Sequence, residues 1–293
     1  MANFKQPPKQ NPLMQYMRQP KIYLRLPSNG AFWEHGSLDM PENQELPVYS
    51  MTAKDELSFK TPDALMNGQG VVDVIQSCIP NIKNAWKIPT IDLDAILIAI
   101  RIATYGPEME ITHGVPGTQE TEEHTVNLNS CLDQIFQNTT WEEEVTINDQ
   151  LTCFVRPLTY DHMTKTSLKT FEAQKIMQVV NSDEYSDEQK LALFNKSFSN
   201  MTDITVQLIA DSIYAIKTPE VVVEDPKFIL EFVQNADKDV FEKVQGRINE
   251  LKERNGLQPI TITATPEQVE AGAPATYQVP IGFDNANFFV RGS

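Results

Sequence analysis

The chain lacks the features that usually mark secreted, membrane-spanning or disulfide-stabilised proteins. Its three cysteines, Cys78, Cys131 and Cys153, are odd in number and widely spaced, which fits neither a disulfide framework nor a zinc knuckle. This usage suits a reducing compartment. The first residues contain no apolar segment of the length that a secretory signal needs, so we expect no secretory signal.

Runs of basic residues are also missing. The chain has 24 Lys and Arg against 40 Asp and Glu, which gives a formal net charge of -16. Such a surface repels phosphate backbones and anionic membranes, so the composition argues against nucleic-acid binding. Solubility is the simplest explanation of the acidity, and contact with basic partner surfaces is the functional alternative.

Familiar catalytic and cofactor motifs cannot be recognised either. The four histidines, His35, His113, His124 and His162, lie near no Gly-x-Ser-x-Gly or cysteine signature that would supply a nucleophile. The Asn-Gly-Gln-Gly at residues 67–70 lacks the Lys-Ser/Thr that follows in a phosphate-binding loop. We therefore predict neither an enzyme nor a bound cofactor, and no catalytic residues are assigned.

One group of candidate metal ligands needs separate treatment. His113 and His124, with Glu120, Glu122 and Glu123 between them, could converge across a hairpin on a zinc ion. The segment contains no cysteine pair and is strongly polar. A solvated hairpin tip is the favoured interpretation, and a metal-dependent hydrolase remains a remote alternative.

The chain does contain one strongly apolar helical segment, residues 89–107. Thr90 is the predicted N-cap, while Gly106 and Pro107 predict the end of the helix. Nearly every position between them is apolar, which is typical of a helix buried on all sides. Because a membrane span needs about 20 apolar residues, we predict the central core helix of a soluble domain.

Two carboxylates lie in the first turn of this predicted helix. Asp92 and Asp94 are two residues apart and should point to different faces, so they are a poor catalytic pair. Compensation of the helix dipole is the predicted role.

The remaining periodicity predicts an α+β fold. It combines a mixed N-terminal region around the buried central helix, a mostly helical middle and a C-terminal β-hairpin. Alternating apolar residues predict strands at residues 21–27, 46–51, 108–112, 125–128, 144–147, 151–156, 220–224, 260–263 and 275–280. Helical spacing predicts helices at residues 70–79, in three runs between 160 and 217, the last covering 204–216, and after Asp225 and Asp237.

These elements suggest a division of the chain into four parts. We expect a flexible N-terminal arm at residues 1–20, an α+β core with β-hairpins at 21–157, a mainly helical region at 158–257, and strands with an aromatic tail at 258–293. Phe283, Phe288 and Phe289 of that tail are candidate partner-binding residues because aromatic anchors often dominate interfaces. A plug of the core is the alternative role for them.

The order of several landmarks resembles a known family. The landmarks are Leu-Pro-Ser-Asn-Gly at residues 26–30, Met-Thr-Ala-Lys-Asp-Glu-Leu at 51–57, Pro-Asp-Ala-Leu-Met-Asn-Gly at 62–68, Ile-Asp-Leu-Asp at 91–94, Thr-Tyr-Gly at 104–106 and Asp-Asn-Ala-Asn-Phe-Phe at 284–289. Together they resemble the baseplate hub proteins of T-even-type contractile-tailed bacteriophages, a family with central-spike-complex and hub-assembly members.

The resemblance implies a virion protein made in the bacterial cytoplasm and located in the tail baseplate. It implies partners among the hub, central spike and tape-measure proteins, and it also allows an oligomer within the baseplate. A transient chaperone for hub or tape-measure proteins, absent from the mature virion, is the alternative from a different class.

Overall fold

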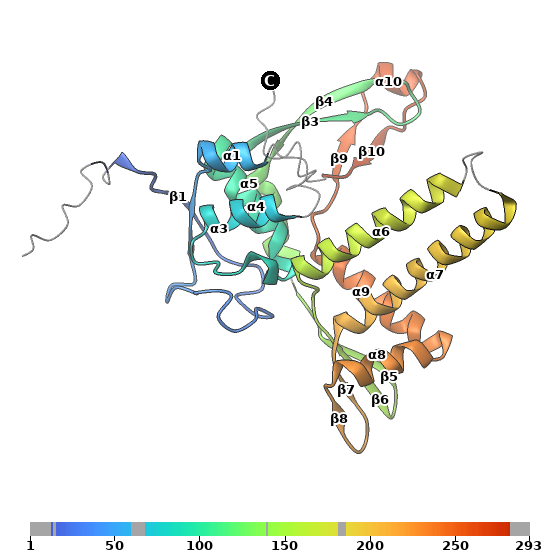
Figure 1. Cartoon of the computed structure of the whole chain (residues 1–293). Coiled ribbons are helices and arrows are strands. Elements are labelled where there is room, and N and C mark those ends of the chain that lie inside the picture. The colour runs from blue at the N-terminus through green and yellow to red at the C-terminus, as the bar shows by residue number, and fades with distance from the viewer. Residues whose placement is uncertain (1–12, 14–15, 60–67, 139, 181–185, 282–293) are drawn as a thin grey trace, which may run out of the picture.

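The computed structural model describes residues 13, 16–59, 68–138, 140–180 and 186–281 of the chain (Figure 1). It confirms the predicted α+β architecture, with small antiparallel sheets and helices around three hydrophobic clusters. None of the helices in these ranges is both long and apolar enough to cross a membrane.

The first and largest cluster surrounds the predicted central helix, α4 (Thr90–Tyr105). Helix α4 packs against β1 (Pro20–Leu24), β2 (Leu46–Tyr49), α3 (Gln69–Cys78) and α5 (Leu128–Asn138). α1 (Ala53–Phe59) and the 3₁₀ turn η2 (Ala85–Lys87) pack against α3. β1 and β2 pair antiparallel. Ile96, Ile98 and Ile100 of α4 are fully buried, as its composition predicts.

The ends of α4 are only partly as predicted. Gly106 has a φ of 95° and its N–H bonds the Ile102 carbonyl, so this glycine does end the helix. The expected N-cap at Thr90 is wrong: Pro89 occupies the N-cap and no side chain caps the helix. The Thr90 N–H instead bonds the carbonyl of Leu158, a residue distant in sequence.

After α4 the chain forms the hairpin of β3 (Glu108–Gly114) and β4 (Thr121–Asn127). The predicted return strand extended one residue too far, because Leu128 begins α5, a helix that we did not expect. Leu128, Cys131 and Ile135 of α5 are buried at helical spacing. Together with Leu132 and Phe136 these residues recur at i, i+3, i+4, i+7 and i+8, the spacing of an amphipathic helix, which our interpretation of the sequence missed.

The second cluster lies under a four-stranded antiparallel sheet with the order β5-β6-β7-β8. Its strands are β5 (Glu144–Asn148), β6 (Leu151–Val155), β7 (Ile213–Lys217) and β8 (Val222–Val223), and its helices are α8 (Pro226–Asn235) and α9 (Lys238–Asn255). The helix predicted after Asp225 is α8, and Asp225 caps it by accepting a hydrogen bond from the Lys227 N–H.

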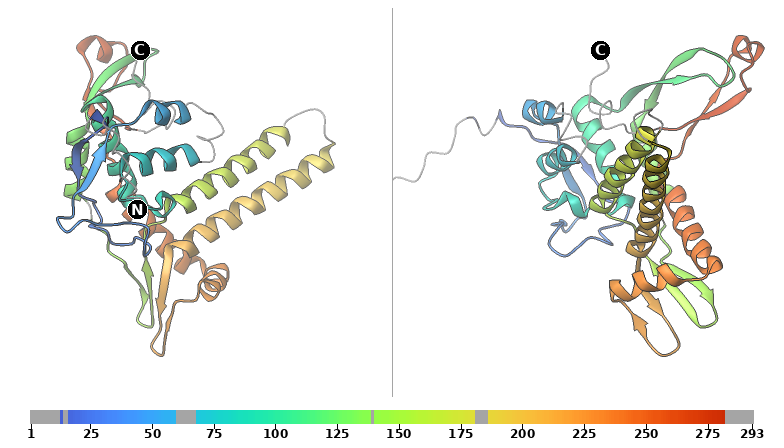
Figure 2. Two further views of the ribbon diagram at one scale, coloured as in Figure 1. Left: turned by 60° about the vertical axis from the view of Figure 1, so that its left-hand side comes forward. Right: turned by 45° about the vertical axis from the view of Figure 1, so that its right-hand side comes forward.

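Two long antiparallel helices, α6 (Tyr160–Val180) and α7 (Asp187–Ser212), form a hairpin that projects away from the rest (Figures 1 and 2). We call it the helical arm. Ser186 and Gln189 form a capping box at the start of α7. The prediction of a separate helix over residues 204–216 is wrong, because α7 continues unbroken to Ser212 and the chain then becomes strand β7.

The predicted C-terminal hairpin is present as β9 (Ile260–Thr263) and β10 (Thr276–Val279), joined through the short helix α10 (Pro266–Glu270). It packs on the β3–β4 hairpin and forms the third cluster, which includes Val115 and Tyr277. Gly117 and Gly272 meet where the two units touch, both with positive φ.

Candidate functional site

The aromatic tail predicted to bind partners, Phe283, Phe288 and Phe289, lies outside the described residues. Its role therefore stays a prediction. At the opposite end, most of the predicted N-terminal arm also lies outside them. Arg18 within it is described, and its guanidinium donates to the carbonyls of Ser50 and Ser77, each at 2.6 Å.

The two histidines of the predicted hairpin tip do share one face of the β3–β4 ladder. His113 lies opposite Glu122, and His124 lies opposite Ile111, so the histidines are diagonal neighbours. Glu120 and Glu123 are exposed. Glu120 precedes β4, and Glu123 is paired with Thr112, on the face of the ladder opposite the two histidines.

This face is not a solvated tip, because the C-terminal hairpin covers it. The His113 ring lies 5.7 Å from the ring of Tyr277, and Gln268 Nε2 donates to Glu122 Oε2 at 3.1 Å. Burial, followed by the charge of Glu122, raises the pKa of Tyr277. Within the described ranges, no group of three or more His, Cys, Asp and Glu is arranged to hold a metal ion.

Asp92 acts as more than a dipole-compensating charge. It is fully buried, and its Oδ1 accepts the Ser28 N–H at 2.8 Å while its Oδ2 accepts the Trp33 Nε1–H at 2.7 Å. Burial raises its pKa to about 6 against the stabilising hydrogen bonds from Ser28 and Trp33. The carboxylate thus fixes the loop that carries Phe32 and Trp33 onto α4.

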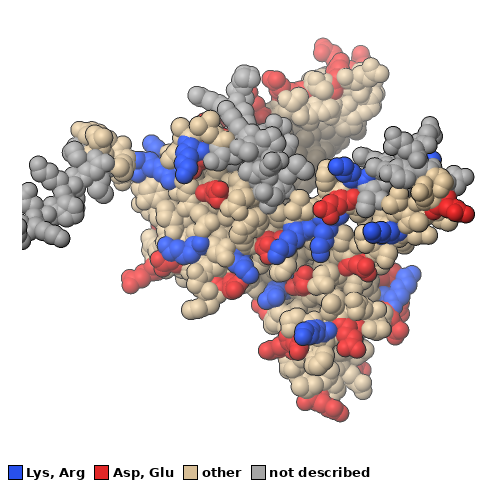
Figure 3. Space-filling view, in the orientation of Figure 1, with Lys and Arg blue, Asp and Glu red and all other residues tan. Residues whose placement is uncertain are grey.

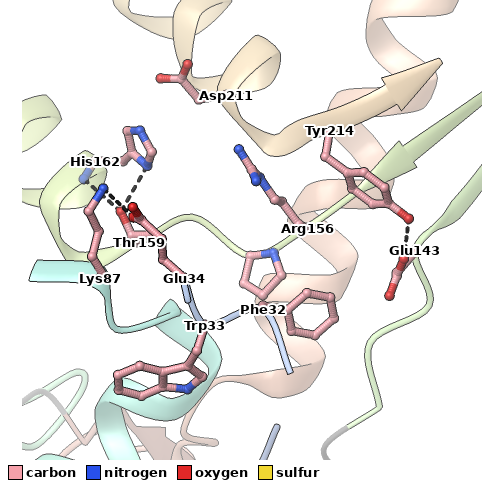
Figure 4. A pocket seen from close by; sticks show the side chains of 11 residues that line it. Phe32, Trp33, Glu34, Lys87, Glu143, Arg156, Thr159, His162, Asp211 and Tyr214 are labelled. Carbon is pink, nitrogen blue, oxygen red and sulfur yellow. Dashed lines mark hydrogen bonds and ion pairs between the residues drawn. The ribbon is translucent and has the colours of Figure 1, made fainter. Parts of the chain in front are cut away.

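That loop forms one wall of a pocket of about 410 Å³ between the first cluster and the base of the helical arm (Figure 4). The opposite walls come from the segments around Arg156 and His162 and from the junction of α7 and β7. Because these segments are far apart in the sequence, local pattern could not predict the pocket. Among its lining residues, only His162 was considered from the sequence as a catalytic candidate.

The polar groups of the pocket are largely matched with one another. Lys87 Nζ lies 2.7 Å from Glu34 Oε2, and the Tyr214 hydroxyl donates to the Glu143 carboxylate. Burial, together with the hydrogen bond to Glu143, raises the pKa of Tyr214 to about 12. Figure 4 shows the Arg156 side chain extending into the space between these residues.

The only histidine in the pocket lining has a structural explanation. Thr159 precedes α6, and its Oγ1 lies 3.0 Å from His162 Nδ1 in the first turn. The His162 N–H also donates to Thr159 Oγ1, at 3.5 Å, which is the hydrogen bond of a helix N-cap. The pair stabilises the beginning of α6, and it also places a hydroxyl within hydrogen-bond reach of a histidine on the pocket wall.

The helical arm carries a line of exposed apolar side chains on α7. Leu191 is 62% exposed, Phe194 42%, Phe198 65% and Met201 39%. We call these four residues the α7 seam. They lie within the helical runs predicted between residues 160 and 217, and their side chains are exposed.

Charged side chains are mixed over the face of the molecule shown in Figure 3, where red and blue residues alternate on the arm and on the sheet below it. No large basic area is visible on that face. The arrangement agrees with the excess of acidic residues in the sequence.

Comparison with known proteins gives one match. The model of a family described as "T4 bacteriophage base plate protein" matches residues 21–254. A search of curated proteins and a search of solved structures gave no match. The matched range begins near β1 and ends at the last turn of α9, so it includes α4, the four-stranded sheet and the helical arm. Since this range is most of the chain, the protein belongs to the family of T4-type bacteriophage baseplate proteins.

Proposed function

We propose that this protein is a component of the baseplate hub, or a factor for hub assembly, that acts through protein–protein contacts. Membership of the baseplate family supports a role in the phage tail and contact with other baseplate proteins. The observation that carries the finer proposal is the helical arm, which projects from the protein and exposes aromatic side chains. Exposed apolar groups of this kind are typical of interaction sites.

Catalysis is not part of this proposal. The pocket in Figure 4 has paired carboxylates and a histidine engaged at a helix start. A nucleophile–base pair also needs a third group that orients the base, and among the described residues no third side chain is hydrogen-bonded to His162. We propose that its residues fix the arm relative to the first cluster.

The hydrolase alternative can be tested through the β3–β4 hairpin. His113→Ala and His124→Ala variants should support phage assembly at wild-type levels if neither histidine is catalytic. A complete loss of function in a variant with an unchanged thermal transition would instead favour a catalytic or metal-binding role.

Quantitative mass spectrometry of purified virions tests the proposed location. A fixed ratio of this protein to other baseplate proteins would support a structural subunit of the hub. Absence from virions, together with a requirement for the protein and its presence in tail intermediates, would support the transient assembly factor or chaperone. Absence from both virions and intermediates would overturn the proposal.

A further inference from the structure

We propose that the outer edge of β3 binds an extended segment of another tail protein as an added β-strand, and that this segment carries Lys or Arg at alternate positions. By the outer edge we mean the backbone of Glu108, Glu110 and Thr112 on the side away from β4. This inference rests on the proposed function, because it specifies one of the protein–protein contacts through which the protein would act.

The outer edge of β3 presents unpaired backbone groups. Within the described ranges, β4 is the only strand that pairs with β3. Directly after β3, the Val115 N–H bonds the Glu120 carbonyl at 2.9 Å. Because hydrogen-bonded pairs alternate along an antiparallel ladder, Glu108, Glu110 and Thr112 direct their N–H and C=O groups away from β4. No other described residue bonds these groups.

This edge differs from the outer strands of the other sheets. β3 has seven residues, and all of them pair with β4 in one continuous register. β1 has five residues, begins with Pro20 and shifts register, while β8 has only two residues and the β5–β6 ladder also shifts. Short strands, prolines and bulges protect an edge against added strands. β3 lacks these three protections, so a strand can pair along its whole length.

The charge beside the edge indicates the side chains of the partner. Glu108 and Glu110 are exposed on one face of the ladder, and Glu123 on β4 is exposed on the same face. Residues 102–155 and 257–281, which include both hairpins, contain no Lys or Arg. Among the described residues, no cation forms an ion pair with these three carboxylates. At the top of Figure 3, where Figure 1 places the ends of the two hairpins, the surface shows red residues and no blue ones.

The spacing of the two glutamates specifies the positions of the partner's basic residues. Glu108 and Glu110 are two residues apart on one strand, so an added strand places two of its own alternate residues directly opposite them. Opposite charges in such cross-strand pairs are stabilising. A helix would direct residues two apart to different faces. The edge therefore fits an extended segment with Lys or Arg at positions i and i+2, in the manner of β-strand addition.

A second copy of this chain fits the edge poorly. Pairing of two β3 edges would bring the glutamates of one copy beside those of the other, and like charges in cross-strand pairs are destabilising. The same charges repel the phosphates of nucleic acids. The acidic edge thus selects against copies of itself and in favour of a basic strand, which is how charge gives specificity to an interface.

A pair of proline variants tests the use of the backbone. Thr112→Pro removes an outward N–H of β3 and no bond to β4, a position where a strand tolerates proline. Thr125→Pro is the matched control, because Thr125 lies opposite Glu110 and directs its N–H to the outer edge of β4. We expect Thr112→Pro to lower the amount of the full-length protein in sedimenting tail intermediates at least tenfold. Thr125→Pro should change it less than twofold. Equal losses would overturn the proposal.

A charge reversal tests the partner's sign and decides the matter if a proline variant fails to fold. Glu108→Lys with Glu110→Lys reverses the edge, whereas Glu267→Lys with Glu270→Lys makes the same change on exposed positions of α10. Both double variants should keep the thermal transition of the wild type, since all four side chains are exposed. We expect a tenfold or greater loss from tail intermediates for the first and little change for the second. Wild-type incorporation of the first variant would overturn the proposal.

Site-specific photo-crosslinking in infected cells tests the identity of the bound segment. The probe is p-benzoylphenylalanine in place of Thr112 in the full chain, and the control has the same group in place of Glu267. We expect position 112, and not position 267, to crosslink to a tail protein through a peptide with Lys or Arg at alternate positions. Crosslinks only to a second copy, or to a segment without that pattern, would overturn the proposal.

The two levels of the argument fail in different ways. If the wild-type protein is missing from all tail intermediates, the proposed function is wrong. If the wild type is present and the folded Glu108→Lys with Glu110→Lys variant is incorporated at the same level, the proposed function stands and the inference about the β3 edge is wrong.

Discussion

Helices α4 and α7 use apolar residues in opposite ways. In α4, Ile96, Ile98 and Ile100 are fully buried among strands and helices of the first cluster. In α7, Phe198 is 65% exposed, while the contact with α6 uses the small residues Ser197 and Ala173. The composition of α4, with almost no polar face, predicts its burial, whereas α7 is amphipathic and only its surroundings decide which of its apolar residues are exposed.

The difference separates the residues that stabilise the fold from the exposed residues that are free to bind a partner. Elements of the first cluster pack against several faces of α4, so each removed methyl group leaves a cavity there. The helical arm has one packed side and one open apolar side, so changes on the open side should affect binding more than folding. Five measurements can break or sharpen this contrast.

The largest expected effect is at the centre of α4. Ile98→Ala should lower the free energy of unfolding by about 4 kcal/mol, because it loses apolar burial and leaves a cavity. Phe198→Ala on the arm is the matched comparison and should change it by less than about 0.5 kcal/mol. Denaturant unfolding of both variants checks this. Equal losses would mean that the seam belongs to the folded core.

The second effect concerns the anchor at the start of α4. Asp92→Ala should cost about 3 kcal/mol at acidic pH, because the half-buried Trp33 Nε1–H and Ser28 N–H lose their acceptor. Aromatic fluorescence should also report movement of Trp33. An unchanged stability at every pH would show that the loop is held by other contacts.

The pH dependence of the same pair gives a signed test. The pKa of Asp92 is raised from 3.8 to about 6 by burial, so the folded protein binds this proton more tightly than the unfolded chain. The stabilisation is complete below about pH 4 and is lost as the pH rises through 6. The stability difference between wild type and Asp92→Ala should shrink by on the order of 2 kcal/mol between pH 4 and pH 7. A difference that grows with pH would contradict the assignment.

The contact between the β3–β4 and β9–β10 hairpins should show an effect of intermediate size. At Gly117, with a φ of 81°, an added Cβ would overlap the carbonyl oxygen of Gly272. Gly117→Ala should therefore separate the β3–β4 and β9–β10 hairpins locally, at a cost of about 2 kcal/mol. Hydrogen exchange should quicken in β9 and β10 and stay unchanged in α4. Gly114→Ala, with open space at its Cβ, is the control.

The smallest expected effect is inside the arm. Ser197→Ala removes the hydrogen bond to the Ala173 carbonyl and should cost about 1 kcal/mol. Hydrogen exchange in α6 and α7 should quicken while α4 remains protected. Ser199→Ala, on an exposed position of the same helix, should leave exchange unchanged. Loss of protection in both α4 and the arm would mean that the two regions unfold as one unit.

Sequence reasoning succeeded where local pattern decides structure and failed where distant contacts decide it. The alternation of residues in β3 and β4 and the caps at Asp225 and Gly106 predicted real elements. The same reasoning extended a helix through Ile213, where pairing with β6 converts an apolar run into a strand. An apolar run of this length is compatible with either structure until a neighbouring strand is present.

The candidate sites show the same limit. Asp92 is recognisable as a first-turn carboxylate, but its hydrogen bonds to Ser28 and Trp33 join residues about 60 positions away. The pocket around Arg156 and Tyr214 likewise unites separate segments. The spacing of residues along the chain does not show which residues far apart in the sequence come into contact.

The sequence by itself determined the α+β class, the buried character of α4 and the apolar spacing of the α7 seam. Periodicity and composition are properties of the chain, and burial follows from them when no polar face is available. Only the tertiary structure decided which apolar face of α7 became exposed and which hairpin covered His113. Those outcomes depend on packing partners, because each helix or strand buries only the faces that its neighbours reach.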